Sequence, residues 1–335
     1  MPSILAQIAP QRSTQYAELA SALAPYELRL STLGAQIDEI RPRTLGGLDY
    51  LQFELPTEPD AAQARELGML AMTSAFFLHY EYIADVAGPL LRPIETNVQW
   101  ALPPDLLTTR RYRGKTNEMF AQFMCNVARA SSALADRPWD TLRVFDPLCG
   151  GGTTLFATLI LGASAAGVDH NAKDVESTVS YLQGFVRTHG IATRLKRERL
   201  KGLGHRYLFT IGKDQEQQCL LADGDTAESA ALISGFRPHL IVTDLPYGIQ
   251  HHGELEALLG GALPVWADLL PPSGALVMAW ESSRFPREEM IELVESASSL
   301  AVLNDPPYDA LAHRVDRVIK QRDLIVARHA SVLRS

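Results

Sequence analysis

The chain has 335 residues, enough for two domains, and its hydrophobic (46%) and charged (21%) fractions are those of an ordinary globular protein. The formal net charge of −8 argues against capture of nucleic acid by the whole surface and leaves room only for a local basic patch. The three cysteines form neither a disulfide framework nor a zinc spacing, and no other metal cluster is evident, so a reducing, cytoplasmic compartment is expected.

The N-terminal part of the chain predicts a smaller α+β domain over residues 1–105. Its first twelve residues lack a basic region followed by a long apolar run, so no signal peptide is expected. Strands are expected at Ser3–Ala9, Tyr26–Leu33 and Gly47–Leu55, and helices at Ser13–Leu23 and Pro59–Met72. The aromatic-rich run Phe76–Ala84 favours a packed core over a base-stacking surface. No catalytic constellation occurs here, which leaves substrate recognition as the expected role.

After a proline-marked linker, Arg110–Ala135 begins as a basic loop, R-R-Y-R-G-K-T-N-E, and continues as an amphipathic helix. Gly114 and Thr116, just before the helix, can form a turn that touches a ligand, although an ordinary capped helix explains them too.

From Leu142 onward strands and helices alternate, which predicts a Rossmann-like, doubly wound α/β sheet in a second domain, residues 106–335. Strands are expected at Leu142–Asp146, Ala165–Asp169, Gln218–Ala222, His239–Asp244 and Ala275–Trp280. Helices are expected at Thr153–Leu161, Asp174–Thr188, Thr226–Ser234, Leu255–Leu270 and Arg287–Ser298. Two final runs, Arg314–Lys320 and Leu324–Ala327, predict an antiparallel hairpin that closes the sheet.

Two stretches invite other interpretations. Residues 147–168 carry no charge and are long enough to span a bilayer, but five glycines and an acid at each end favour loop, helix and buried strand. Residues 194–206, R-L-K-R-E-R-L-K-G-L-G-H-R, form the densest positive stretch, followed by a strand at Tyr207–Gly212. This insertion is either a solvated loop or a phosphate-contacting segment, through Lys196 and Arg197 among others.

The chain is organised around Val144–Asn171, which reads as strand, glycine turn, helix, strand and acid. Such a turn serves a nicotinamide cofactor, a nucleoside triphosphate or S-adenosylmethionine. No lysine follows the glycines to meet a triphosphate, and the third glycine of a dinucleotide site is replaced by Leu155. Asp146 before the turn would repel a pyrophosphate and suits a cationic ligand, whose ribose hydroxyls Asp169 can bind.

A second constellation, T-D-L-P-Y-G, follows the strand that ends at Asp244. Carboxyl ends of strands face the ligand crevice of a doubly wound sheet, so Asp244 and Tyr247 are expected beside the glycine turn. The Asp244 carboxylate and the Leu245 carbonyl can accept hydrogen bonds from a conjugated amine and aim its lone pair, while Tyr247 stacks on the ring. Catalysis would come from positioning and electrostatics rather than from a strong base.

Other candidates are weaker. Asp305–Tyr308, D-P-P-Y, is a more literal version of the motif, but too little chain follows it for the remaining strands and helices, so we read it as a turn that can line the substrate side. Asp225, or Asp223 close by, is expected to accept from an adenine amino group. His251 and His252 are expected to face solvent, and Glu281–Ser283 is a minor substrate candidate.

Three motifs resemble a known family. D-P-L-C-G-G-G-T at Asp146–Thr153 is similar to the signature of the RNA methylases. T-D-L-P-Y-G at Thr243–Gly248, and the segment Arg111–Ala128, are similar to those of tRNA guanine-N2 methyltransferases that carry a THUMP domain. The resemblance covers about residues 106–328 and implies a methyltransferase that uses S-adenosylmethionine to methylate guanine N2 in tRNA. It does not extend to the basic insertion, to Ala157, where the family usually has an acid, or to a recognisable THUMP domain.

The site residues expected from pattern and resemblance fall into three groups. The catalytic residues are Asp244, Pro246 and Tyr247. The cofactor-binding residues are Thr116, Asp146, Pro147, Cys149, Gly150, Gly152, Thr153, Asp169, His170, Asp223, Gly224, Asp225 and Asp244. The substrate-binding residues are Leu245, Tyr247, Gly248, Arg113, Lys196 and Arg197.

The sequence is also consistent with other functions. The acceptor can instead be a DNA base or a small-molecule or protein amine, and the acidic charge favours a small molecule over DNA. A non-catalytic nucleoside-binding module is disfavoured by the intact loop after Asp244, because binding a cofactor needs no such loop. A nicotinamide oxidoreductase is disfavoured by Asp146 and the missing third glycine.

Overall fold

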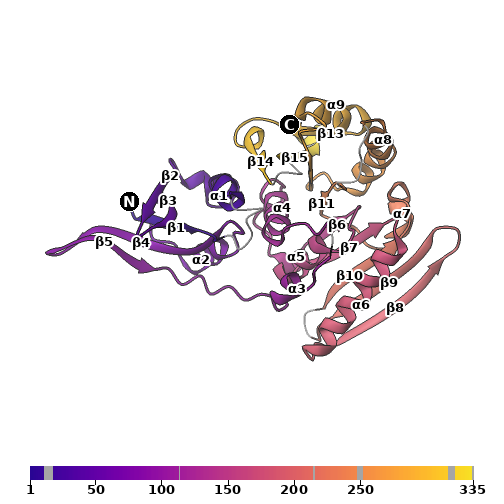
Figure 1. Cartoon of the computed structure of the whole chain (residues 1–335), viewed down its shortest axis with the longest axis horizontal. Coiled ribbons are helices and arrows are strands. Elements are labelled where there is room, and N and C mark those ends of the chain that lie inside the picture. Colours follow the sequence, from indigo (N-terminus) through magenta and orange to yellow (C-terminus); the bar gives the residue numbers. More distant parts are fainter. Residues whose placement is uncertain (11–17, 113, 214–215, 247–251, 316–320, 334–335) are drawn as a thin grey trace.

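The computed structural model describes residues 1–10, 18–112, 114–213, 216–246, 252–315 and 321–333. They build a five-stranded antiparallel sheet from the N-terminal part of the chain and a ten-stranded mixed sheet from the rest. The two sheets lie at opposite ends of an elongated molecule (Figure 1). Among the described helices, none is both long and apolar enough to cross a membrane.

The N-terminal sheet has the strand order β2-β3-β1-β4-β5. Its chain order is strand, helix, two strands, helix, strand, which is the split βαβ arrangement of ferredoxin-like folds, with β5 added at the β4 edge. The elements are β1 (Ser3–Ile8), α1 (Leu19–Leu30), β2 (Arg41–Leu45), β3 (Leu48–Glu54), α2 (Ala61–Gly68), β4 (Thr73–Ile83) and β5 (Val86–Pro93). In α2, Asp60 and Gln63 form a reciprocal capping box.

The strands expected at Ser3–Ala9 and Gly47–Leu55 are confirmed, but the strand expected at Tyr26–Leu33 is wrong, because helix α1 runs to Leu30. The alternation of apolar and polar residues in Tyr26–Leu33 is typical of a strand. However, Leu19, Leu23 and Glu27 recur every four residues, and they bury one face of a helix. The expected cap Ser13 lies outside the described residues. In β4 the packed-core prediction holds for Phe76, which is buried, but not for Tyr82, which is 73% exposed.

The large sheet has the order β13-β15-β12-β11-β6-β7-β10-β9-β8, with β14 paired to β15. Strands β10, β7, β6, β11 and β12 are parallel, and their neighbours on both sides are antiparallel. The strands are β6 (Arg143–Asp146), β7 (Ser164–Asp169), β8 (Thr193–Leu200), β9 (Gly204–Ile211), β10 (Gln217–Asp223), β11 (Leu240–Asp244), β12 (Ala275–Glu281), β13 (Leu300–Leu303), β14 (His313–Arg314) and β15 (Gln321–His329). The doubly wound α/β prediction is confirmed.

Helices cover both faces of this sheet. On one face α4, α5 and α6 pack on the strands, and on the other face α8 and α9 bury apolar side chains with the short α7 turn. The helices are α3 (Asp105–Thr108), α4 (Glu118–Ala130), α5 (Thr153–Leu161), α6 (Ala172–Thr188), α7 (Ser229–Leu232), α8 (His252–Leu269), α9 (Arg287–Ala297) and α10 (Ala330–Leu333). The uncharged stretch at 147–168 is thus a turn, a nine-residue helix and a strand, as expected.

Two parts of the large sheet differ from expectation. The insertion 194–206 is not a loop, because β8 and β9 pair as an antiparallel hairpin along the β10 edge. Charged residues occupy the exposed positions of β8 while Leu195 packs on the core, so strand alternation is present but masked by arginine and lysine. The sequence reasoning also missed β13, and β15 pairs with β12 and β13 in addition to the short β14.

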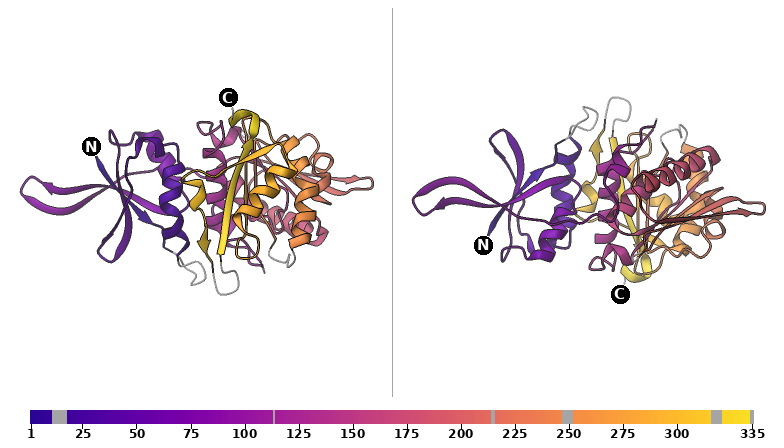
Figure 2. Two further views of the ribbon diagram at one scale, coloured as in Figure 1. Left: turned by 90° about the horizontal axis from the view of Figure 1, so that it is seen from above. Right: turned by 90° about the horizontal axis from the view of Figure 1, so that it is seen from below.

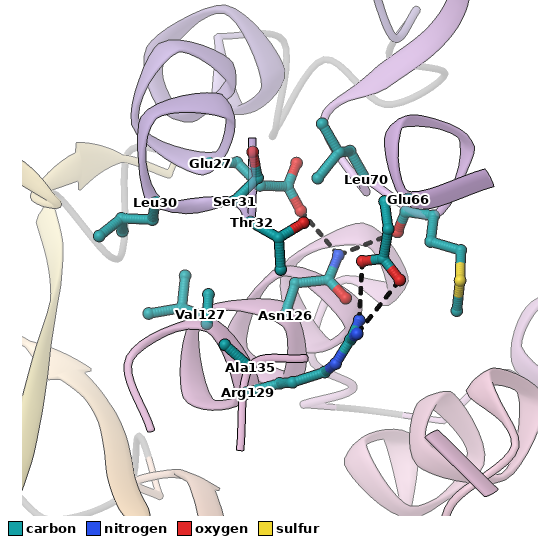
Figure 3. A pocket seen from close by; sticks show the side chains of 12 residues that line it. Glu27, Leu30, Ser31, Thr32, Glu66, Leu70, Asn126, Val127, Arg129 and Ala135 are labelled. Carbon is teal, nitrogen blue, oxygen red and sulfur yellow. Dashed lines mark hydrogen bonds and ion pairs between the residues drawn. The ribbon is translucent and has the colours of Figure 1, made fainter. Parts of the chain in front are cut away.

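The two sheets share one continuous apolar cluster, in which α1 packs against α4. At this junction the buried Glu27 carboxylate accepts hydrogen bonds from the backbone N–H groups of Ala71 and Met72 and from Asn126, at 2.8 Å each. Arg129 on α4 makes a two-pronged ion pair with Glu66 on α2 (Figure 3). These contacts hold the N-terminal sheet in a fixed position beside α4.

Candidate active site

A cavity of about 340 Å³ lies at the carboxyl ends of the parallel strands. Strand order reverses between β6 and β11, and ligands of doubly wound sheets bind at such a switch point. The volume fits a nucleoside-sized ligand. The lining comprises Tyr112, Gly114, Thr116, Asp146, Leu148, Cys149, Gly150, Gly151, Thr153, Thr154, Asp169, His170, Asn171, Asp174, Asp244, Leu245 and Pro246.

Asp146 ends β6 and is buried, with 3% of its surface exposed. Its carboxyl group accepts hydrogen bonds from the Thr243 hydroxyl (2.9 Å) and the Leu148 backbone N–H (3.1 Å). These donors are neutral, so burial dominates and raises the pKa of Asp146 to about 7. Among the residues that the structure describes, no cation forms an ion pair with Asp146, which leaves the carboxyl able to respond to a positively charged ligand.

Asp169 ends β7, next to β6, and its two oxygens are held by different backbone groups. One accepts from Gly150 in the glycine turn and the other from Asn171, both at 2.8 Å. Each carboxylate oxygen retains a further lone pair that can accept from a ligand hydroxyl. Asp169 therefore ties the turn to β7 while it faces the cavity.

The glycine turn is covered by the loop that precedes α4. Arg110 donates to the Gly151 carbonyl at 2.6 Å and to the Thr178 hydroxyl at 2.8 Å. Tyr112 forms a 2.6 Å hydrogen bond with Thr153, and a Cβ on Gly151 would lie only 2.2 Å from the Tyr112 ring. Gly151 thus leaves room for the ring. Arg110 and Tyr112 belong to the basic loop R-R-Y-R-G-K-T-N-E, but their contacts with the glycine turn are not predicted from the sequence.

Asp244 ends β11 and has a different set of partners. Thr116 donates to one carboxylate oxygen at 2.7 Å, and Arg322 on β15 forms an ion pair with the other. The Arg322 side chain is buried, and its guanidinium lies 4.5 Å from the centre of the Phe120 ring. Phe120 also contacts the buried His313, whose pKa falls to about 3 because of burial and the nearby Arg322. Asp244 is thus clamped from both sides.

Arg322 was not recognised from the sequence, where it falls in an expected turn between two strands. Its only signal is a charged residue beside an apolar run, Leu324–Ala327, which is common at strand ends. The pairing of β15 with β12 carries it to the cavity, because Arg322 stands opposite Glu281, at the carboxyl end of β12.

Several expected site residues do not line the cavity. Gly152 caps the start of α5, and Pro147 is absent from the lining. Asp223 instead accepts from the His205 backbone N–H, and the Asp225 carboxylate caps a short turn by accepting from Ala227. The lining also lacks Gly224, Lys196, Arg197, Asp305–Tyr308 and Glu281–Ser283.

Some expected residues cannot be placed. Arg113, Tyr247, Gly248 and His251 lie outside the described residues, as does the His252 side chain. Within the described ranges, no group of three or more histidine, cysteine or acidic side chains is arranged to hold a metal ion.

Comparison with known proteins gives matches in structure only. No family model matches the chain, and no curated protein matches it in sequence. The fold is similar to that of TrmN from Thermus thermophilus, with 13% identity and a TM-score of 0.48 over 98% of this chain and 100% of that one. It is also similar to the rRNA methyltransferase aviRa from Streptomyces viridochromogenes, with 16% identity and a TM-score of 0.44 over 70% of this chain and 93% of that one. A third similar structure is magnesium protoporphyrin IX methyltransferase from Synechocystis with bound SAM. It is 14% identical with a TM-score of 0.39, over 65% of this chain and 87% of that one.

Proposed function

We propose that the protein is an S-adenosylmethionine-dependent N-methyltransferase acting on an exocyclic amine of a nucleic-acid base, with guanine N2 in tRNA as the leading acceptor. The observation that carries the proposal is the meeting of three acids, Asp146, Asp169 and Asp244, in one cavity at the switch point of the sheet. Three carboxyl groups suit a ligand with cationic groups and a ribose, and they would repel a phosphate.

The residues present fit this cofactor. The Asp146 carboxylate would face its positive charge, and the free lone pairs of Asp169 would accept from the ribose hydroxyls. Leu148 and the backbone of Gly150 and Gly151 would form the close wall of the site. When bound, S-adenosylmethionine supplies an electrophilic methyl group, so the protein needs no strong nucleophile of its own.

The role of Asp244 would be to orient the acceptor. With Thr116 and Arg322 each holding one oxygen, the carboxylate keeps one orientation and still has a lone pair for one N–H group of a conjugated amine. The Leu245 carbonyl would accept the second N–H, while Pro246 fixes the turn and Tyr247 stacks on the base. This alignment would direct the nitrogen lone pair at the methyl carbon. The N–H proton released after transfer would pass through Asp244 to solvent.

Support for a nucleic-acid acceptor comes from the sequence motifs that resemble tRNA guanine-N2 methyltransferases. We further propose that residues 106–335 form the catalytic domain and that residues 1–105 form a domain rigidly attached to it. The base would have to leave its stack to reach the loop after Asp244, as bases do in enzymes that modify them.

The direct test is transfer of labelled methyl from S-adenosylmethionine to separate pools of total tRNA, DNA and small metabolites, followed by nucleoside analysis. Label in N2-methylguanosine from tRNA is expected. Label only in DNA or in a metabolite would support methyl transfer from S-adenosylmethionine but would contradict tRNA as the acceptor.

Calorimetry with S-adenosylhomocysteine and NAD complements this test. Binding of S-adenosylhomocysteine alone is expected. Binding of S-adenosylhomocysteine without methyl transfer to any pool would favour a nucleoside-binding module. Binding of NAD alone would overturn the assignment of S-adenosylmethionine as the cofactor.

A further inference from the structure

The charges of this protein are distributed very unevenly along the chain. Residues 1–105 contain thirteen acidic residues, six arginines and no lysine, so this part carries most of the negative charge. The β8–β9 hairpin, residues 193–211, contains six arginines and lysines and a single acid, Glu198. Both views in Figure 2 place the β4–β5 hairpin of the acidic part at one end of the molecule and the β8–β9 hairpin at the other.

Three of the six arginines in the acidic part form ion pairs with acidic neighbours. Arg41 pairs with Glu39, Arg43 with Glu81, and Arg92 with Glu58. A phosphate chain approaching this surface would meet a net excess of carboxylates.

Among the described residues, three of the six cations of the β8–β9 hairpin form ion pairs and three do not. Arg194 pairs with Glu216 at 2.6 Å, and Lys196 and Arg206 both pair with Glu198. Arg197, Arg199 and Lys201 are exposed, and within the described part of the chain none of them has an acidic partner within 4.0 Å. These three side chains, which we call the basic row, are available for an anionic partner.

The basic row lies on the same edge of the sheet as the cavity. Asp223 on β10 stands level with Asp169 on β7, and β9 runs back from that point, so the hairpin turn at 201–203 lies at the carboxyl-end edge. Strands are spaced about 4.8 Å apart, which puts β8 about 14 Å from β7.

The turn is held close against the end of β10. The His205 backbone N–H donates to Asp223 at 3.1 Å. A Cβ on Gly204 would come within 2.0 Å of the Asp223 carbonyl oxygen, and its φ of +149° also favours glycine. The basic row therefore has a fixed position relative to the site.

We propose that the β8–β9 hairpin grips the RNA substrate through Arg197, Arg199 and Lys201, and that the acidic N-terminal part makes no phosphate contacts. The inference rests on the proposed function and says where its substrate lies. The cavity is lined by acids and would exclude phosphates, so the sugar-phosphate chain must run outside it. The basic row lies along the same edge of the sheet, about 24 Å from β11, the strand that ends in Asp244. Only the target base would enter the cavity.

The test compares two triple variants that lose the same charge. One is Arg197→Ala/Arg199→Ala/Lys201→Ala, and its matched control is Arg41→Ala/Arg43→Ala/Arg92→Ala in the acidic part. Binding of total tRNA is measured by filter retention at several salt concentrations, and binding of S-adenosylhomocysteine by calorimetry shows that each variant is folded. The hairpin variant is expected to lose at least tenfold in tRNA affinity, and its log–log salt slope to fall by about 2. The control is expected to stay within about threefold.

Equal loss in both variants, or no loss in the hairpin variant while the wild type binds tRNA, overturns the inference and leaves the proposed function standing. Failure of the wild type to bind tRNA while it binds S-adenosylhomocysteine overturns the inference together with the RNA acceptor. Duplex DNA that binds more tightly than tRNA and depends on the basic row would overturn the assignment of RNA as the partner.

Discussion

Two neighbouring strands, β6 and β11, each end in an aspartate that faces the same cavity, yet the two carboxyl groups are held in different ways. Asp146 receives hydrogen bonds from a hydroxyl and a backbone N–H, and burial raises its pKa to about 7. Asp244 is held by the guanidinium of Arg322 and the hydroxyl of Thr116. Position on a sheet edge therefore does not fix the role of an acid, because its hydrogen-bond and ion-pair partners decide whether it responds to a ligand's charge or serves as a fixed acceptor.

Replacing the clamped acid is expected to have the largest effect. Asp244→Asn keeps the shape but puts an N–H where an acceptor is needed, so methyl transfer should fall about 10²–10³-fold. Affinity for S-adenosylhomocysteine should stay within a few-fold. Single-turnover transfer and calorimetry measure the two quantities, and retained turnover would contradict the role of Asp244 in orienting the acceptor.

Replacing the buried Arg322 tests whether its ion pair with Asp244 contributes to stability and activity. Arg322→Met leaves Asp244 without its ionic partner, and we expect a loss of about 3 kcal/mol in stability and about 100-fold in kcat. The double variant Arg322→Met/Asp244→Asn should recover much of the stability but none of the activity. Urea unfolding and steady-state kinetics separate the outcomes, and a stability unchanged by Arg322→Met would argue against the clamp.

The Asp146→Asn variant tests whether Asp146 binds the positive charge of the cofactor. The variant should bind S-adenosylhomocysteine about tenfold more weakly, because an amide cannot neutralise the ligand's ammonium group. Wild-type affinity should fall as the pH drops below about 7, the pKa of Asp146, and the variant should lack this dependence. Calorimetry across this pH range gives the answer, and parallel profiles would contradict it.

The same variant changes stability in a direction set by the pKa. The pKa of Asp146 is raised in the folded state, so its contribution to stability is full at acidic pH and is lost as the pH rises through about 7. Asp146→Asn should therefore gain stability relative to the wild type as the pH is raised from about 5 to about 8. Thermal melts in paired buffers measure the difference, and a constant difference would mean that Asp146 does not titrate there.

The smallest effect is expected at Thr116, which supplies one hydrogen bond to Asp244 at 2.7 Å. Thr116→Val preserves the shape and should reduce kcat about threefold, while Thr116→Ser should restore it. A loss equal to that of Asp244→Asn would mean that Thr116 acts on the ligand directly.

Much of the large sheet could be predicted from the sequence, because its parallel strands are nearly continuous apolar runs and each of the acids Asp146, Asp169 and Asp244 ends one of them. The second half of helix α1 could not be predicted, since the short alternating run from Tyr26 fits both the helical and the strand period. The β8–β9 hairpin was hidden because an edge strand rich in arginine and lysine lacks the apolar signal of a buried one.

Among the residues around the cavity, those next to glycine or proline motifs can be predicted from the sequence, and those brought in by tertiary contacts cannot. Arg322 reaches Asp244 across 78 positions of sequence, and Arg110 reaches the glycine turn across 41. No local sequence pattern predicts a contact between residues so far apart in the chain. Conversely, Asp225 follows a strand as a site acid would, but its carboxylate caps the turn that follows.

One measurement tests the division of roles between the two acids most directly: single-turnover methyl transfer to tRNA by Asp146→Asn and Asp244→Asn as the concentration of S-adenosylmethionine is raised. Asp146→Asn should approach the wild-type rate once the cofactor is saturating, because it has lost binding that the ground state and the transition state share. Asp244→Asn should remain slow at every concentration. Recovery of both variants, or of neither, would contradict the assignment of Asp146 to the cofactor and Asp244 to the acceptor.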